Sequence, residues 1–339
     1  MNILVTGAGG FIGHHLVKRL KKDGHRVVGC DWKHPEFEPT HADMFFNVDL
    51  RSKDQTELVY KSGGRFDEVY SLAANMGGMG FIENYKAIIM RDSALISINV
   101  LEAARKYGAR RLFYSSSACA YNIELQKETD NPALSEGMAY PAMAEAGYGW
   151  EKLYAEMLCE HYTEDFGLTT RIARFHNVYG PFGTWRGGRE KAPAAMCRKV
   201  LLTEDNGEID IWGDGIQTRT FMYIEDCLDG VLRIMRGDYP HPLNLGTDYM
   251  ISINDLAKLA MSFENKNLTL KHIPGPLGVR GRSSDNTLIK KVLGWEPTIP
   301  LEQGLKENYF WIKSEIEKAR AQGETVDVRS YLPDSDSDE

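Results

Sequence analysis

The chain has 339 residues, of which 42% are hydrophobic and 26% are charged. This length accommodates one large α/β domain or two closely packed ones, and the composition is that of a globular protein with a sizeable core. The formal net charge of −8 argues against nucleic acid as the main partner, because neutralising phosphates requires a basic surface. A phosphorylated small molecule remains compatible with this charge, since it needs only a local cluster of arginine and lysine.

Cysteine usage and hydropathy predict a cytoplasmic protein that does not enter membranes. The cysteines are odd in number and too widely spaced to suggest a metal site. Because the first residues resemble a strand rather than a signal peptide, we expect the cysteines to be reduced thiols. The five are Cys30, Cys119, Cys159, Cys197 and Cys227. No apolar run approaches the ~18–20 residues that a membrane span needs. The acidic tail, residues 326–339, is predicted to be disordered.

Predicted strands and helices alternate through the first half of the chain. The expected strands are 2–6, 26–31, 43–48, 66–72, 111–115 and 170–174, and the expected helices are 10–22, 54–61, 81–107 and 145–166. This alternation predicts an α/β fold built on a doubly wound parallel sheet of the Rossmann type, with right-handed crossovers.

The alternation loosens after about residue 174. Loops rich in glycine, proline and arginine (180–193, 212–219 and 274–282) are separated by what we expect to be short helices. They predict a smaller, mixed α/β portion that caps the substrate. We expect residues 221–246 to return and complete the main sheet. The predicted parts are therefore discontinuous: residues 1–174 plus about 221–246, and about 175–220 plus 247–325.

A glycine-rich segment joins the first predicted strand to the first predicted helix. Gly7 permits a tight turn, Gly10 lets a pyrophosphate approach the backbone, and Gly13 allows the helix to pack closely. The helix N-terminus adds amide donors and partial positive charge. The candidate cofactor contacts here are Gly7, Gly9, Gly10, Phe11, Ile12 and Gly13. Alone, such a string could be a flexible loop, but the flanking strand and helix favour a dinucleotide site.

Two aspartates after the next strands are candidates for the adenosine half of a dinucleotide. Asp31 ends the second predicted strand, 24 residues after Gly7. A carboxylate there accepts hydrogen bonds from a ribose diol and repels a 2′-phosphate, which favours NAD over NADP. A helix cap or surface aspartate is the alternative interpretation. Asp49 follows the third predicted strand and is a candidate for contact with adenine.

Ser117, Tyr148 and Lys152 form a second candidate group. Tyr148 and Lys152 are four residues apart and share one face of the predicted helix. A nearby ammonium and a positive nicotinamide ring both favour the phenolate, so we expect them to lower the pKa of Tyr148 from ~10. The phenolate can then take the proton of a sugar hydroxyl while hydride leaves, and Ser117 can orient the reacting oxygen. A tyrosine and lysine at this spacing also occur together by chance.

Longer motifs carry a family resemblance over nearly the whole chain, to about residue 318. They are the stretches 72–82, 116–119, 174–183, 187–193, 212–215 and 278–285. With the glycine turn, Tyr148 and Lys152, they resemble the extended short-chain dehydrogenase/reductase family and its nucleotide-sugar epimerases. Met-Gly-Gly-Met-Gly (76–80) and Gly-Gly-Arg-Glu-Lys-Ala-Pro (187–193) are similar, more narrowly, to the members that epimerise GDP-mannose at C3 and C5.

The resemblance implies a cofactor, a substrate and a domain organisation. It implies NAD bound by residues 1–174 plus about 221–246, and GDP-mannose or a related nucleotide sugar bound by about 175–220 plus 247–325. Transient oxidation at C4, proton exchange at C3 and C5 and re-reduction would give GDP-L-galactose, GDP-L-gulose or both. A homodimer would form through the helices predicted at 81–107 and 145–166.

The resemblance also implies residue roles. Cys119 and Lys191 would exchange protons at C3 and C5, while Tyr148 and Lys152 would run the oxidation at C4. The implied substrate contacts are Gly77, Ser117, Asn177, Glu190, Lys191, Lys199, Gln217, Arg219 and Arg282. Among these, Arg282 lies near Arg280 in a glycine-flanked loop and suits bidentate binding of a diphosphate.

The expected chemistry needs a base on one face of the sugar and an acid on the other. Oxidising C4 to a ketone makes the neighbouring C–H bonds exchangeable through an enolate. Cys119 and Lys191 have unperturbed pKa values of ~8.5 and ~10.4, and a positive nicotinamide together with their mutual attraction would favour thiolate. Taken singly, Cys119 also suits a small buried residue, and Lys191 a solvated loop lysine.

Single residues distinguish the other activities that this fold could support. A 4-epimerase would use Tyr148, Lys152 and NAD and leave Cys119 idle. An NADPH-dependent epimerase-reductase is disfavoured by Asp31. A 4,6-dehydratase would want carboxylates just after Ser117, where the chain has alanine and cysteine. A non-catalytic NAD-binding scaffold would show no turnover of any nucleotide sugar.

Overall fold

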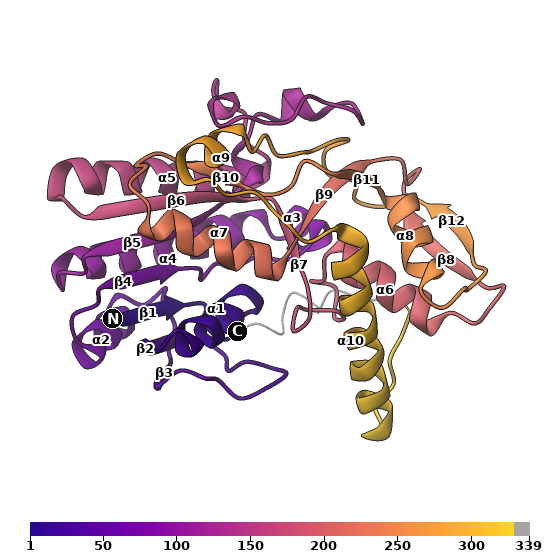
Figure 1. Ribbon diagram of the computed structural model, residues 1–339, viewed down its shortest axis with the longest axis horizontal. Helices are drawn as coiled ribbons and strands as arrows, with labels where there is room; N and C mark the ends of the chain where they lie inside the picture. Colours follow the sequence, from indigo (N-terminus) through magenta and orange to yellow (C-terminus); the bar gives the residue numbers. More distant parts are fainter. Residues whose placement is uncertain (329–339) are drawn as a thin grey trace.

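A seven-stranded parallel sheet dominates one side of the computed structural model, which describes residues 1–328 (Figure 1). Its strands are β1 (Asn2–Thr6), β2 (Arg26–Asp31), β3 (Met44–Asn47), β4 (Glu68–Ser71), β5 (Arg111–Ser117), β6 (Thr169–Phe175) and β10 (Leu243–Leu245). Their spatial order is β10-β6-β5-β4-β1-β2-β3, and all the pairings are parallel. The chain order reverses between β1 and β4, which confirms the predicted doubly wound sheet.

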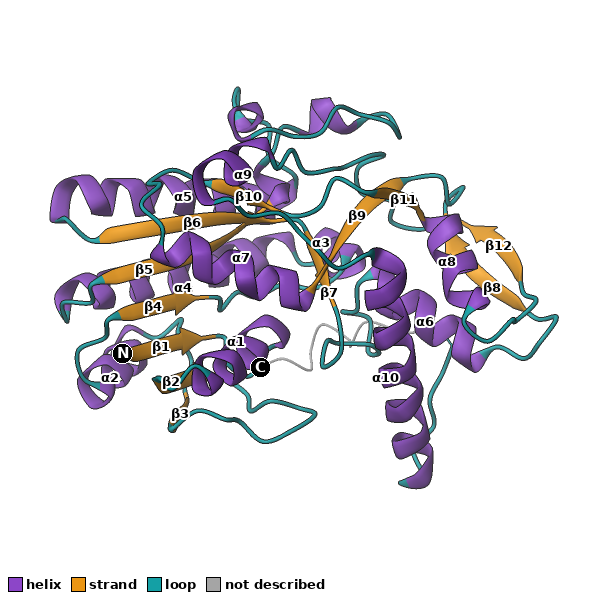
Figure 2. Ribbon diagram, viewed as in Figure 1, coloured by secondary structure: helices purple, strands orange, loops and turns teal. Residues whose placement is uncertain are grey.

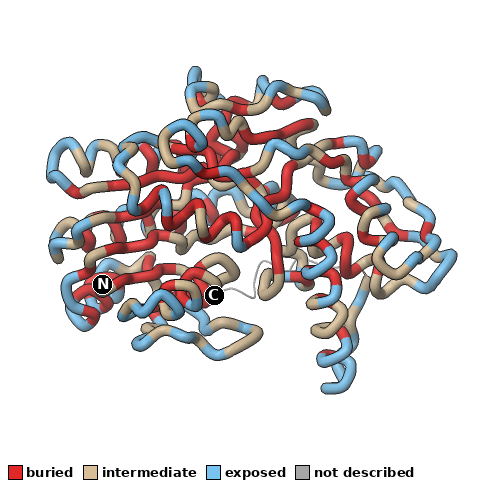
Figure 3. Tube along the Cα trace, viewed as in Figure 1, coloured by how far each residue is buried: buried red, intermediate tan, exposed pale blue. Residues whose placement is uncertain are grey.

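Helices cover both faces of this sheet (Figure 2). On one face α1 (Phe11–Lys22) packs beside α7 (Ile224–Arg236), and on the other lie α2 (Lys53–Gly63), α4 (Lys86–Lys106) and α5 (Ala146–Phe166). Side chains along β1 alternate between the two layers, so Ile3 joins the core under α1 and α7 while Leu4 joins the other core. Both faces are covered, and the strands inside the edge strand β3 are accordingly mostly buried (Figure 3).

The smaller portion is mixed α/β, as predicted. Its strands are β7 (Asn177–Tyr179), β9 (Thr218–Tyr223) and β11 (Met250–Ser252) in one sheet, and β8 (Glu208–Trp212) and β12 (Thr269–Ile273) in another. Its helices are α6 (Ala192–Leu202), α8 (Ile253–Ser262) and α10 (Leu301–Ala321), and α9 (Thr287–Leu293) packs near β10. In the first of these sheets β9 pairs in parallel with β7 and antiparallel with β11.

Three sequence-based boundaries need correction. The helix expected over 81–107 is broken at Tyr85, whose backbone leaves the helical region (φ −119°, ψ 37°), so that α3 (Met79–Asn84) and α4 are separate. Of the segment 221–246, only β10 joins the main sheet, because β9 pairs with β7 and β11 instead. The helices after residue 174 are not all short, since α10 spans 21 residues.

The periodicity of α10 explains its length. Leu305, Tyr309, Ile312 and Ile316 recur every three or four residues and are all buried on one face of the helix. Every helix within residues 1–328 is too short or too polar to cross a lipid bilayer. From residue 329 onward the predicted acidic tail lies outside the described residues. Just before it, the carbonyl of Asp327 accepts a hydrogen bond from Arg198 at 2.8 Å.

Candidate active site

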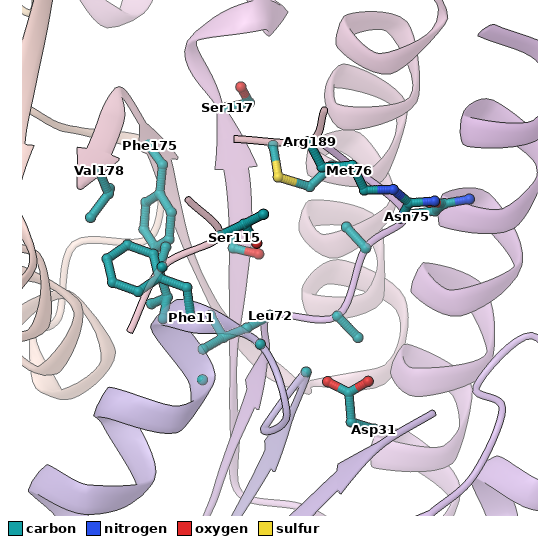
Figure 4. Close-up of a pocket in the computed structure, with 18 of the residues that line it drawn as sticks. Phe11, Asp31, Leu72, Asn75, Met76, Ser115, Ser117, Phe175, Val178 and Arg189 are labelled. Carbon is teal, nitrogen blue, oxygen red and sulfur yellow. The ribbon is translucent and has the colours of Figure 1, made fainter. Parts of the chain in front are cut away.

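A cleft of about 720 Å³ opens at the carboxyl ends of the main-sheet strands. It runs from Asp31, at the end of β2, past the glycine turn to Ser117, at the end of β5 (Figure 4). Tyr148 and Lys152 of α5 and Lys191 of the loop before α6 also line it. The sheet thus brings together candidate residues from distant parts of the sequence, at the edge where such folds bind ligands.

The glycine turn is built for the phosphates of a dinucleotide. Gly7 has φ +71°, a conformation that favours glycine, and a Cβ on Gly13 would stand 2.1 Å from the carbonyl oxygen of Gly7. The turn and the start of α1 are therefore in close contact. No side chain caps α1, and Phe11 and Ile12 of its first turn line the cleft. These first-turn amides and the helix dipole suit a pyrophosphate.

Asp31 is held in place by backbone amides. Its carboxylate accepts hydrogen bonds from Gly9 at 3.0 Å and from Lys33 at 3.3 Å, and its side chain lines the cleft. Burial raises the pKa of Asp31, and the amide hydrogen bonds oppose that shift. A fixed carboxylate at the end of β2 fits the ribose diol of NAD. Gly9 thus acts by orienting Asp31, a role that its place in the glycine string did not show.

Asp49 also lines the cleft, but a neighbouring arginine engages it. Arg51 donates to Asp49 through its backbone amide at 2.8 Å and through Nε at 3.0 Å, and Arg51 also pairs with Asp92 at 3.0 Å. Partial burial opposes ionisation of Asp49, yet the hydrogen bonds from Arg51 outweigh it and lower the pKa of Asp49. Arg51 and Asp92 line the same end of the cleft and escaped the sequence-based prediction.

Tyr148 and Lys152 are both buried in α5, and the lysine has further partners. Lys152 Nζ lies 5.6 Å from the ring centre of Tyr148, donates to the Tyr114 hydroxyl at 3.1 Å and lies 3.8 Å from Glu151 Oε2. Burial raises the pKa of Tyr148, nearby Cys119 and Glu151 add to the shift, and a hydrogen bond with Ser117 opposes it. Taken together, these protein groups raise the pKa of Tyr148 rather than lower it, so the expected lowering rests on a positively charged nicotinamide.

Cys119 lies against Tyr148 in a short 3₁₀ turn that follows β5. Its backbone amide donates to Ser117 Oγ at 3.1 Å, and Arg282 Nη1 lies 3.6 Å from its sulfur. Burial raises the pKa of the thiol, and the charge of Glu145 adds to this, while Arg282 opposes it. These protein groups therefore favour the thiol, and the expected thiolate rests on Lys191 and a positively charged nicotinamide.

Lys191 reaches the same region from the other portion of the molecule. Burial lowers the pKa of its ammonium, and the charge of Cys119 opposes that shift, so the two groups interact electrostatically although they are 72 residues apart. The loop before Lys191 is tied to the other glycine-rich motif, because the Gly78 amide donates to the carbonyl of Arg189 at 3.0 Å. The two motifs behind the narrower family resemblance thus meet in the fold.

Arg282 and Arg219 lie beside Cys119 rather than on the open cleft. Arg282 is buried and donates to Gln126 Oε1 at 2.6 Å and to Glu145 Oε2 at 2.7 Å. Arg219 donates to the carbonyls of Thr218 and Leu277, and burial followed by the charge of Arg282 lowers its pKa to about 10. Both guanidinium groups thus have protein partners. Sequence reasoning missed Glu145 and Gln126, because only tertiary contacts bring them to Arg282.

Three other expected substrate contacts do not line the cleft and have protein partners of their own. Asn177 donates to the Thr220 carbonyl, Lys199 to the Asp210 carbonyl and Gln217 to the Trp212 carbonyl. Gln217 Oε1 is buried and has no hydrogen-bond partner within residues 1–328.

Glu190 and Gly77 sit where the two glycine-rich motifs meet. Glu190 accepts hydrogen bonds from the Gly188 amide and from Arg198, each at 2.8 Å. Its carboxylate therefore stabilises the loop before α6 in this structure. Gly77 is buried beside Phe81, which packs with Cys119 and Tyr148.

Comparison with known proteins agrees with this architecture. The model of the NAD dependent epimerase/dehydratase family matches residues 3–246. The chain is 52% identical over 98% of its length to GDP-mannose 3,5-epimerase 1 of Oryza sativa subsp. indica, and 51% identical over 97% to GDP-mannose 3,5-epimerase of Arabidopsis thaliana. The matches cover 86% of each relative.

A solved structure extends the agreement to the fold and the cofactor. UDP-glucuronic acid 4-epimerase from Bacillus cereus, in complex with UDP-glucuronic acid and NAD, superposes with a TM-score of 0.77 at 26% identity, covering 93% of this chain and 100% of that one. The uncapped start of α1 and the fixed carboxylate of Asp31 fit the same cofactor. The chain therefore belongs to the NAD-dependent epimerase/dehydratase family, and NAD is its cofactor.

Proposed function

We propose that this protein epimerises GDP-mannose at C3 and C5, giving GDP-L-galactose, GDP-L-gulose or both. The observation that carries the proposal is the 52% identity, over 98% of the chain, to an enzyme with this name. The geometry agrees with it, because a thiol and an amine interact electrostatically beside the buried Tyr148 and Lys152. A 4-epimerase needs only the tyrosine and the lysine.

Tyr148, Lys152 and Ser117 serve the oxidation at C4. Bound NAD would take hydride from C4 and later return it. The Tyr148 phenolate accepts the proton of the C4 hydroxyl, and a hydrogen bond with Ser117 orients the phenol. Lys152 adds positive charge 5.6 Å from the ring, which favours the phenolate. The bond from Lys152 to Tyr114 fixes the position of that charge.

Cys119 and Lys191 serve the exchange at the neighbouring carbons. A ketone at C4 acidifies the C–H bonds at C3 and C5, so one group removes a proton and the other delivers one to the opposite face. They come from different portions of the molecule, Cys119 from the end of β5 and Lys191 from the loop before α6. Positioned acid and base groups contribute on the order of 10²–10⁴-fold to such steps.

The remaining candidates would bind the nucleotide and the sugar. These candidates are Gly77, Asn177, Glu190, Lys199, Gln217, Arg219 and Arg282. Binding a diphosphate through Arg282 or Arg219 would require either guanidinium to exchange a present protein partner for phosphate oxygens.

The activity is tested by incubating the NAD-loaded protein with GDP-mannose and separating the nucleotide sugars by chromatography. The proposal expects one or two new peaks, identified by NMR as the L-galactose form, the L-gulose form or both. Parallel incubation with UDP-glucose separates the main alternative. Conversion of UDP-glucose to UDP-galactose, with GDP-mannose unchanged, would replace the proposal with a 4-epimerase.

The quaternary structure we propose is a homodimer formed through α4 and α5. These helices pack against each other, and both expose large apolar side chains. The exposed ones are Ile88, Met90, Leu95 and Ile98 on α4, and Trp150, Tyr154 and Met157 on α5. Covering them with the same two helices of a second copy would bury an apolar surface of the kind that marks protein interfaces.

For the domain organisation and the cellular location we keep the sequence-based expectations as proposals. The NAD-binding part would comprise residues 1–174 plus about 221–246, with β10 completing the sheet. The nucleotide-sugar-binding part would comprise about 175–220 plus 247–325. A cytoplasmic location is supported by the five cysteines, which are all buried and unpaired.

A further inference from the structure

A buried charge pair touches the thiol of Cys119. Arg282 Nη2 and Glu145 Oε2 are 2.7 Å apart, and the other terminal nitrogen of Arg282 lies 3.6 Å from the sulfur. Burial raises the pKa of the thiol, and the Glu145 carboxylate lies close enough to raise it further. One sulfur thus faces a carboxylate that favours its protonated form and a guanidinium that favours its ionised form.

The backbone fixes this arrangement. The amide of Glu145 donates to the carbonyl of Cys119 at 2.9 Å, so the residue that precedes α5 is tied to the turn that carries the thiol. On the far side, Arg282 Nε donates to Gln126 Oε1 at 2.6 Å. The side chains of Glu145 and Arg282 are both about nine-tenths buried, so water screens their charges only weakly.

We propose that Glu145 is a positioning residue that keeps Cys119 as a thiol and thereby makes it the proton donor of the epimerisation. This inference rests on the proposed function. In the step, the S–H bond breaks and its proton forms a C–H bond with the electron pair of the enolate carbon. The sulfur becomes a thiolate, which Arg282 stabilises. The Lys191 amine takes the proton from the opposite face, and solvent restores both groups after turnover.

The charges around Cys119 support this assignment. The charged or titratable groups that face it are Glu145, Tyr148, Lys191, Arg219 and Arg282. Burial opposes ionisation of Glu145, but the charge and hydrogen bond of Arg282, together with Cys119 and Arg219, hold the pKa of that carboxyl below its usual range. Glu145 is therefore a carboxylate that accepts the proton of the thiol. Burial meanwhile lowers the pKa of Lys191, which suits an amine acting as the base.

The test measures the pH midpoint of Cys119 alkylation by iodoacetamide in the full-length, NAD-loaded protein without sugar. A Cys119→Ser variant gives the background from the four other cysteines. Glu145→Gln should lower the midpoint by about one pH unit or more, because the positive charge of Arg282 then acts unopposed. Arg282→Gln should raise it, and the double variant should return close to wild type. Glu124→Gln, an exposed carboxylate paired with Lys127, is the matched control and should leave the midpoint unchanged.

An unchanged or raised midpoint in Glu145→Gln would overturn the inference. If Glu145→Gln fails to fold, Arg282→Gln can be compared with the double variant, because these two proteins differ only at residue 145. Equal alkylation midpoints in the two proteins would also overturn the inference. The measurement needs no turnover, so it fails independently of the proposed function. Shifted midpoints without conversion of GDP-mannose would reject the activity alone.

Discussion

The ammonium of Lys152 lies one helical turn from Tyr148, yet it donates its hydrogen bond to Tyr114 at 3.1 Å. Its nitrogen stands 5.6 Å from the ring centre of Tyr148. Burial raises the pKa of Tyr148, and the charges of Cys119 and Glu151 add to the shift, so these protein groups favour the protonated phenol. We therefore expect deprotonation of Tyr148 to depend on NAD binding.

We expect NAD to lower the titration midpoint of Tyr148 by about 1–3 pH units, since the nicotinamide adds a positive charge beside a buried phenol. The phenolate absorbance is followed against pH with and without NAD, and the spectrum of Tyr148→Phe is subtracted to remove the other tyrosines. Tyr107→Phe, at the end of α4, serves as the control. If NAD does not change the titration midpoint of Tyr148, deprotonation does not depend on cofactor binding and the prediction is wrong.

Gly13→Ala should weaken both the fold and NAD binding. The added Cβ would stand 2.1 Å from the Gly7 carbonyl oxygen, so α1 must shift away from the turn that receives the pyrophosphate. Overpacking of this kind costs about 1–3 kcal/mol, measured by chemical denaturation, and calorimetry follows NAD affinity. Gly137→Ala is the matched control, because nothing lies within 4 Å of its added Cβ. Equal NAD affinity in the two variants would contradict the close contact.

Asp31→Asn should reduce the preference for NAD over NADP. The substitution removes the charge that repels a 2′-phosphate and weakens the acceptor for the ribose diol. We expect NAD affinity to fall roughly tenfold, which corresponds to about 1.4 kcal/mol, and the discrimination against NADP to shrink. Isothermal calorimetry with both dinucleotides measures this. Asp54→Asn, exposed in the first turn of α2, should match wild type. Unaltered discrimination in Asp31→Asn would assign the selectivity to another group.

Leu95→Asp should convert the dimer to monomers. The side chain is 40% exposed on α4, and a charge there could not be buried against a second copy without a large desolvation penalty. Light scattering after gel filtration reports the mass. Phe310→Asp provides the control, because Phe310 is 41% exposed on α10, in the smaller portion of the molecule. Monomeric wild type, or loss of the dimer in both variants, would count against an interface through α4 and α5.

Local patterns predicted much of the fold and part of the site. The glycine turn, Asp31 and the Tyr148–Lys152 spacing are short-range signals, and the structure places all of them along one cleft. The 3.6-residue period of α10 was also readable, although its length was underestimated.

Contacts between distant segments were beyond sequence reasoning. Gln126 meets Arg282 across 156 residues, and Glu145 meets it across 137. Neither spacing follows from periodicity. The effect of burial on Tyr148 and Cys119 was missed for the same reason, because burial is the largest cause of both pKa shifts and depends on the complete fold.

The central claim is that ketone formation at C4 acidifies the C–H bonds at the adjacent carbons C3 and C5. Incubating the NAD-loaded protein with GDP-mannose in heavy water and recording NMR spectra tests this directly. The account predicts solvent deuterium at C3 or C5 and none at C4, with incorporation abolished in Cys119→Ser. New sugars that carry no deuterium at C3 or C5, or no exchange and no conversion at all, would contradict it.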